Sequence, residues 1–206
     1  EMVYGANKLV KDDATRQKWN EAIAKQYPSD YRALNNMAQQ AISKGDMAAA
    51  QNYLKQAANV NKNASEVNTN LALMALKSGD VAKAETYLSK GTGSDTFKEV
   101  MGNLNIAKGN YTQAASDLAG VNTNSAALAQ ILAKDYTSAK TTLSKIKNAD
   151  ATTSYLQAVL AARTGDSSAL SSSLKNAIQQ DGTLAARAAK DLEFAKYANV
   201  VKNLVK

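Results

Sequence analysis

Residues 34–57 read LNNMAQQAISKGDMAAAQNYLKQA, and residues 68–91 read NTNLALMALKSGDVAKAETYLSKG. The two stretches align without a gap, and Gly45-Asp46 in the first falls on Gly79-Asp80 in the second, 34 residues later. A glycine in this position ends a helix because it adopts the left-handed conformation, and the Asp that follows caps the next helix. Each stretch therefore predicts a helix, a tight turn and a second helix.

A third copy surrounds Lys108-Gly109-Asn110, with its glycine 30 residues after Gly79. Small residues such as Ala38 and Ala72 allow the two helices of a unit to approach closely. One such pair cannot bury its apolar face alone, so several pairs must stack. Ala and Leu dominate the hydrophobic residues and the chain has one Pro, a composition that favours helices. The sequence predicts an all-α protein of stacked antiparallel helix pairs.

This unit, with its Gly-Asp turn and its spacing of large and small residues, resembles the tetratricopeptide repeat (TPR) family. The resemblance covers residues 31–118 and implies a right-handed α–α superhelix. Pro28 matches the proline with which the family ends a second helix. We therefore interpret residues 14–27 as the second helix of an incomplete earlier unit, with Trp19 and Ile23 facing inward.

We expect the whole chain, residues 1–206, to form one TPR-like solenoid. Its parts are a partial N-terminal repeat at 1–28, regular repeats at 31–118, degenerate repeats at 120–180 and C-terminal capping helices at 182–206. Within the degenerate part, Asp135-Tyr136 keeps the turn and the second helix without a glycine, and Thr164-Gly165-Asp166 is a further turn. Because the chain starts within a repeat, we also expect it to be part of a longer protein.

The chain contains neither Cys nor His. Disulfides, thiolate or imidazole metal sites, and Ser-His-Asp or Cys-His nucleophiles are therefore excluded. The sequence also has no glycine-rich phosphate loop of the G-x-x-x-x-G-K type. We expect no catalytic, cofactor-binding or metal-binding residue, and we do not expect an enzyme.

The net charge is +7, from 25 Lys and Arg against 18 Asp and Glu. These charges are spread along the chain without a run of five like charges, which is typical of solvated helix surfaces. We therefore do not expect nucleic acid as the partner. The chain has no apolar stretch of the roughly 18 residues that a transmembrane helix needs, so we expect no transmembrane segment in it.

The TPR resemblance implies that the first helices of the units line a concave groove. Its candidate peptide-binding residues are Arg32, Asn36, Gln39, Asn70, Leu73 and Asn103. Asn36 and Asn70 stand 34 residues apart, so we expect them to stack on successive helices and to bond the backbone of an extended peptide. Arg32, one turn before Asn36, can hold a carboxylate with two hydrogen bonds. The alternative is that each Asn bonds a neighbouring helix.

Arg32 and the two asparagines resemble part of the carboxylate clamp with which co-chaperone TPR domains hold a peptide C-terminus. The third unit departs from that pattern, because it has Thr96 and Val100 where the clamp needs basic residues. The clamp is therefore incomplete in this chain.

These patterns favour a protein- or peptide-binding scaffold that uses the concave groove. The alternative is a structural spacer or self-assembly element without a groove ligand. Residues 103–111, 126–129 and 188–194 are also similar to tail regions of larger Bacteroidetes envelope proteins that combine TPR units with a surface or OmpA-like part. That resemblance implies a periplasmic or outer-membrane-associated location and no known activity.

Overall fold

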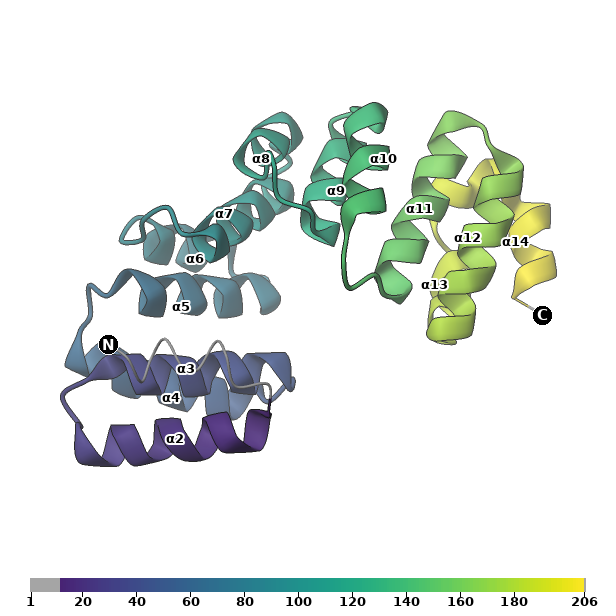
Figure 1. Ribbon diagram of the computed structural model, residues 1–206. Coiled ribbons are helices and arrows are strands. Elements are labelled where there is room, and N and C mark those ends of the chain that lie inside the picture. Colours follow the sequence, from purple (N-terminus) through teal and green to yellow (C-terminus); the bar gives the residue numbers. More distant parts are fainter. Residues whose placement is uncertain (1–11, 206) are drawn as a thin grey trace. The chain divides into compact units, whose positions relative to one another are not determined.

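The computed structural model describes residues 12–205, in which helices are the only regular secondary structure (Figure 1). The prediction of an all-α fold is confirmed. The chain divides into two compact units, and the boundary lies between Ala107 and Lys108. The single continuous solenoid expected from the sequence stays a prediction. No helix within residues 12–205 combines the length and the apolar character needed to cross a membrane.

The first unit consists of helix pairs that follow the predicted repeats. Its helices are α2 (Asp13–Gln26), α3 (Tyr31–Ser43), α4 (Met47–Val60), α5 (Ser65–Lys77), α6 (Val81–Leu88) and α7 (Asp95–Ala107). Helices α3 and α4 pack as one pair, and α5 and α6 pack as the next. Helix α5 also contacts α3 and α7, so the first helices of successive repeats lie next to one another within this unit.

The second unit continues the same pattern with shorter helices and ends in an irregular cap. Its helices are α8 (Tyr111–Asp117), α9 (Asn124–Leu132), α10 (Tyr136–Lys145), α11 (Ala151–Thr164), α12 (Ser167–Gln180), α13 (Leu184–Ala188), the 3-10 helix η1 (Leu192–Tyr197) and α14 (Ala198–Leu204). Helices α9 and α10 form a pair, α11 and α12 form the next, and η1 packs against α11.

Each turn within a helix pair, and the turn that follows α7, has one residue in the left-handed conformation. These residues are Gly45 (φ 78°), Gly79 (φ 79°), Gly109 (φ 77°), Lys134 (φ 64°) and Gly165 (φ 83°). After four of them an Asp carboxylate accepts a backbone N–H of the next helix, as when Asp46 accepts from Ala49 at 3.0 Å. The predicted turns are confirmed, including the one at Lys134 that lacks a glycine.

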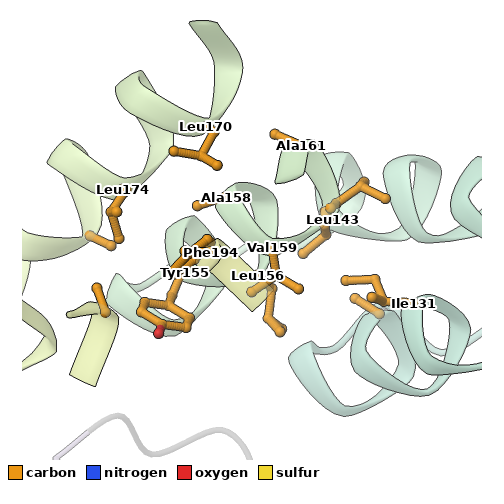
Figure 2. Packing of buried hydrophobic residues seen from close by; sticks show 14 of the residues in the cluster. Ile131, Leu143, Tyr155, Leu156, Ala158, Val159, Ala161, Leu170, Leu174 and Phe194 are labelled. Carbon is orange, nitrogen blue, oxygen red and sulfur yellow. The ribbon is translucent and has the colours of Figure 1, made fainter. Parts of the chain in front are cut away.

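The same positions of each repeat are buried even where the sequence pattern is weak. The fifth residue after each left-handed residue has no exposed surface; these residues are Ala50, Ala84, Ala114, Ala139 and Leu170. The ninth residue is always a buried leucine; these are Leu54, Leu88, Leu118, Leu143 and Leu174. Figure 2 shows Leu170 and Leu174 on α12 facing Ala158 of α11 in the core of the second unit. The same two positions are thus buried after each of these turns.

Helix α2 differs from its prediction in the face that it buries. Trp19 is 40% exposed, whereas Asn20 has no exposed surface. The prediction that Trp19 faces inward is therefore wrong. The side chain of Asn20 accepts a hydrogen bond from the amide of Asn36 on α3, and this polar contact orients the helix.

Candidate functional site

The two asparagines predicted to line a groove join neighbouring helices instead. Asn70 on α5 is only 2% exposed, and its Nδ2 donates to Oδ1 of Asn35 on α3 at 2.8 Å. Asn36 on α3 donates to Oδ1 of Asn20 on α2 at 3.4 Å. Buried amides need such partners because they have lost their water. The side chain of Asn70 therefore lies between helices, as in the alternative in which each Asn bonds a neighbouring helix.

Arg32 is held by its own helix terminus. Its Nε and Nη2 donate to the carboxylate of Asp30 at 3.0 Å and 2.8 Å. The same carboxylate caps α3 by accepting the backbone N–H of Arg32. Because Nε and Nη2 of Arg32 already form this bidentate pair, the guanidinium would have to leave Asp30 to hold a peptide carboxylate in the same way.

The other three predicted residues lie on the first helices of the first unit. Gln39 on α3 is exposed, and Leu73 on α5 and Asn103 on α7 are half-buried. Their helices are neighbours, since α5 packs against both α3 and α7. Peptide binding by these residues stays a prediction.

Three cavities recur at equivalent places in the repeats. They measure about 120 Å³ beside α3 and α4, 480 Å³ beside α5 and α6, and 430 Å³ beside α11 and α12. Each is lined by residues eight and five before the left-handed residue and one, four and eight after it. Leu71, Met74 and Tyr87 are examples in the second cavity. These cavities therefore follow from the geometry of stacked helix pairs.

A fourth cavity, of about 460 Å³, does not follow this register. We call it the α9–α11 groove, because it lies between the first helices of two successive pairs and is completed by the C-terminal cap. It is lined by Asn124, Ser125, Leu128, Ile131, Leu132, Thr152, Tyr155, Leu156, Val159, Arg163, Leu184, Arg187, Asp191 and Glu193. A cleft of this size is typical of ligand sites.

The floor of the groove is apolar. Leu156 and Val159 on α11 are almost fully buried, and Leu128 on α9 is half-buried against the same core. Figure 2 shows Leu156 and Val159 on α11 extending toward Ile131 of α9. Because α9 and α11 are both first helices, the floor belongs to the face on which the sequence predicts a concave groove.

Tyr155 forms the junction between α11 and the cap. Its hydroxyl donates to Oδ2 of Asp191 at 2.6 Å, and its ring meets that of Phe194 edge to face at a centroid distance of 5.5 Å. The guanidinium of Arg187 lies 5.0 Å from the Tyr155 ring centroid, within range of a cation–π contact. Burial, and secondly the bond to Asp191, raise the pKa of the Tyr155 phenol well above its usual range.

Arg163 links three elements of the groove. Its Nε and Nη2 donate to the two carboxylate oxygens of Glu193 in η1, at 2.7 Å and 2.5 Å. Its Nη1 donates to the backbone carbonyl of Ile131 on α9 at 2.9 Å. The paired Glu193 carboxylate raises the pKa of the guanidinium, which stays charged. Arg163 therefore fixes α9, α11 and the cap around the groove.

Some of the remaining polar groups at the groove already have hydrogen-bond partners, and others do not. Asn124 donates to Asp150 and accepts from Thr153, so its amide is occupied. The hydroxyls of Ser125 and Thr152 form no hydrogen bond with residues 12–205. Arg187 is exposed and has no ion pair within that same range. The groove therefore offers hydrogen-bond donors at its rim.

Comparison with known proteins agrees with this fold. Residues 41–100 match the family model described as tetratricopeptide repeat. The crystal structure of PilW, a widely conserved type IV pilus biogenesis factor, superposes with a TM-score of 0.61 at 16% identity, over 87% of this chain and 88% of that chain. No curated protein sequence matches the chain. Neither similarity indicates an enzyme family. The family match and the structural similarity together show that the chain contains tetratricopeptide repeats within an all-helical, TPR-like fold.

Proposed function

We propose that this chain is a non-enzymatic scaffold that binds an extended peptide or a partner protein, and that the α9–α11 groove is its main binding surface. The observation that carries the proposal is the 460 Å³ cavity, which lies outside the repeat register and has an apolar floor. An apolar floor supplies affinity, and a few polar groups at the rim fix the orientation of a ligand.

The fold supports this use. TPR folds typically mediate protein–protein interactions, and stacked repeats present extended concave surfaces to their partners. In the first unit, Gln39, Leu73 and Asn103 form a second proposed peptide-binding surface, which belongs to that unit alone. Arg32 and Asn36 contribute to it at most through their outer edges, because Asp30 and Asn20 engage them.

We also propose that the chain acts in the cell envelope, in the periplasm or at the outer membrane, as part of a larger protein. PilW has a similar fold and is a pilus biogenesis factor, which supports an envelope role without extending that activity to this chain. Fractionation of source cells in which the natural protein that contains this chain carries a tag tests the location. Recovery of that protein only with cytoplasmic marker proteins would contradict it.

The binding proposal is tested by filling the groove. Thr152 is exposed and lines the groove, so Thr152→Trp places an indole at its mouth with little disturbance of the core. Thr141→Trp is the matched control, because Thr141 is also exposed, lies on α10 and does not line the groove. The immobilised wild-type chain and both variants are each incubated with envelope extract from the source organism.

We expect Thr152→Trp to lose the partner that the wild type and Thr141→Trp both recover, while circular dichroism shows all three folded. Recovery of the same partner in equal amounts by all three chains would refute binding in this groove. The proposal would also fail if Thr141→Trp lost the partner to the same extent as Thr152→Trp.

A further inference from the structure

We infer that the α9–α11 groove selects a peptide segment in which side-chain carboxylates alternate with apolar side chains. The inference rests on the proposed function, since it names the chemistry of the ligand in that groove. Three observations carry it: the state of the charged groups at the rim, the segment that α11 already binds, and the charge of the surrounding unit.

The charged groups of the groove differ in what they still can bind. Glu193 is occupied by Arg163. Asp191 accepts the hydroxyl of Tyr155 through Oδ2 and the backbone N–H of Glu193 through Oδ1. Arg187 lies over the Tyr155 ring, is exposed, and forms no ion pair with the described residues. Donors are therefore available at the rim while the acidic acceptors are in use, and a carboxylate is the complementary ligand group.

The chain's own cap shows which chemistry α11 accepts. In the segment Asp191–Phe194, the first carboxylate accepts from Tyr155, the second pairs with Arg163, and the aromatic ring packs against Tyr155. The segment thus combines two acidic residues with a buried apolar one, in the alternating order Asp, Leu, Glu, Phe. Figure 2 shows Phe194 of this segment against Tyr155 in the core.

The rest of the groove offers the same kinds of group beside the segment Asp191–Phe194. Leu128 on α9 and Leu156 on α11 provide an apolar surface, and Arg187 on α13 provides the cation. The hydroxyls of Ser125 and Thr152 are free to bond the backbone of an extended segment. A second segment with acidic and apolar side chains in alternation therefore fits beside the one already bound.

The charge of the second unit acts in the same direction. Residues 108–206 contain 12 Lys and Arg against 7 Asp and Glu, a net charge of +5. Five of the seven acids accept backbone N–H groups at helix starts or turns; these are Asp135, Asp150, Asp166, Asp181 and Asp191. A surplus of cations raises the local concentration of an acidic partner and increases its rate of association.

The experiment measures the fluorescence anisotropy of labelled peptides that are acetylated and amidated at their ends. The first peptide alternates Glu and Leu over eight residues, the second has Gln in place of each Glu, and the third has Lys there. A fourth peptide repeats the Gln series but keeps a free C-terminal carboxylate, which separates terminal from side-chain carboxylates. Each is titrated with the wild-type chain and with four variants.

The variants isolate Arg187 and the groove. Arg187→Gln removes the unpaired cation, and Arg187→Lys restores the charge. Lys175→Gln is the matched control, because Lys175 is an exposed cation on α12 that does not line the groove. Thr152→Trp blocks the groove itself.

We expect the wild type to bind the Glu-Leu peptide more tightly than its three counterparts, and salt to weaken only that interaction. Arg187→Gln should lower this affinity roughly two- to fivefold, as for a solvent-exposed ion pair. Arg187→Lys and Lys175→Gln should retain most of it, and Thr152→Trp should abolish it.

Two results would overturn the inference and are distinguishable from failure of the proposed function. In the first, Thr152→Trp abolishes binding, but the Glu and Gln peptides bind equally or the free C-terminus alone confers binding. Binding in the groove is then correct, and the proposed chemistry of its ligand is wrong. In the second, no Glu-Leu binding is measurable at about 1 mM, or Thr152→Trp binds as the wild type does; the inference then fails, and the extract experiment decides the proposed function.

Discussion

The amide of Asn70 on α5 donates a buried hydrogen bond to Oδ1 of Asn35 on α3, at 2.8 Å. Both side chains are at most 5% exposed, so this pair is a polar contact inside the stack of first helices. Its place in the core fixes the position of one repeat on the next, because a shift of either helix would leave two amides without a partner.

Replacing Asn70 should destabilise the first unit without affecting the groove of the second. Asn70→Ala removes the donor and leaves the buried carbonyl of Asn35 unpaired, which costs about 1–3 kcal/mol. The single tryptophan, Trp19, lies in the same unit, so its fluorescence follows the unfolding of that unit in urea. Asn52→Ala, at an exposed position on α4, is the control. An Asn70→Ala chain with unchanged stability would show that the pair contributes nothing net.

The glycine at the end of α11 should be needed for its backbone conformation alone. Gly165 has φ 83°, and a Cβ built on it meets no atom within 4 Å. Gly165→Ala should therefore lower the free energy of unfolding by about 1–2 kcal/mol, the cost of the left-handed conformation for a residue with a Cβ.

Gly182→Ala is the matched control, since that position is equally open and does not have the left-handed φ. We expect it to be neutral or stabilising by up to about 1 kcal/mol, because Ala restricts the unfolded chain. Equal effects of the two substitutions, measured by thermal unfolding, would contradict this assignment.

Much of the fold could be predicted because the repeat acts through local rules. A left-handed residue followed by a capping Asp, with buried residues five and nine positions later, is visible in the sequence around Gly45 and Gly79. The same rules extend to Lys134, where the following Asp135 reveals the turn although the glycine is missing.

The burial of Asn20 and the composition of the groove could not be predicted in this way. Apolar periodicity favours Trp19 as the buried residue of α2, and a bond between two amides from different helices leaves no trace in such a pattern. Likewise Tyr155 bonds Asp191 36 residues later, and Arg163 bonds Glu193 30 residues later, because η1 packs on α11. The local signal for this contact is limited to residues 182–206, which the sequence predicts as C-terminal capping helices.

The segment Asp191–Phe194 of the cap should depend on one of its two apolar side chains. Phe194 is 1% exposed and packs against Tyr155, whereas Leu192 is 87% exposed. Phe194→Ala should therefore lower the free energy of unfolding by about 3–5 kcal/mol, and Leu192→Ser should change it by less than about 0.5 kcal/mol. Urea unfolding followed by circular dichroism measures both. Equal losses for the two variants would mean that Leu192 is covered in solution, for example by a partner or a second copy.

The buried phenol of Tyr155 should make the second unit sensitive to alkaline pH. Its burial and its bond to Asp191 raise its pKa in the folded state above the value of about 10 that an unfolded tyrosine has. As the pH rises past about 10, the unfolded chain loses this proton first, so the stabilising contribution is complete below that pH and is lost above it. The slope from this one group is at most about 1.4 kcal/mol per pH unit.

Urea unfolding measured from about pH 8 to about pH 11 tests this linkage. Tyr155→Phe should be less stable at neutral pH, because Asp191 loses its hydroxyl donor, and its stability should fall less steeply above about pH 10 than that of the wild type. Tyr27→Phe is the control, since Tyr27 is 54% exposed and should keep the steeper wild-type dependence. A Tyr155→Phe chain as pH-sensitive as the wild type would place the alkaline transition on other groups.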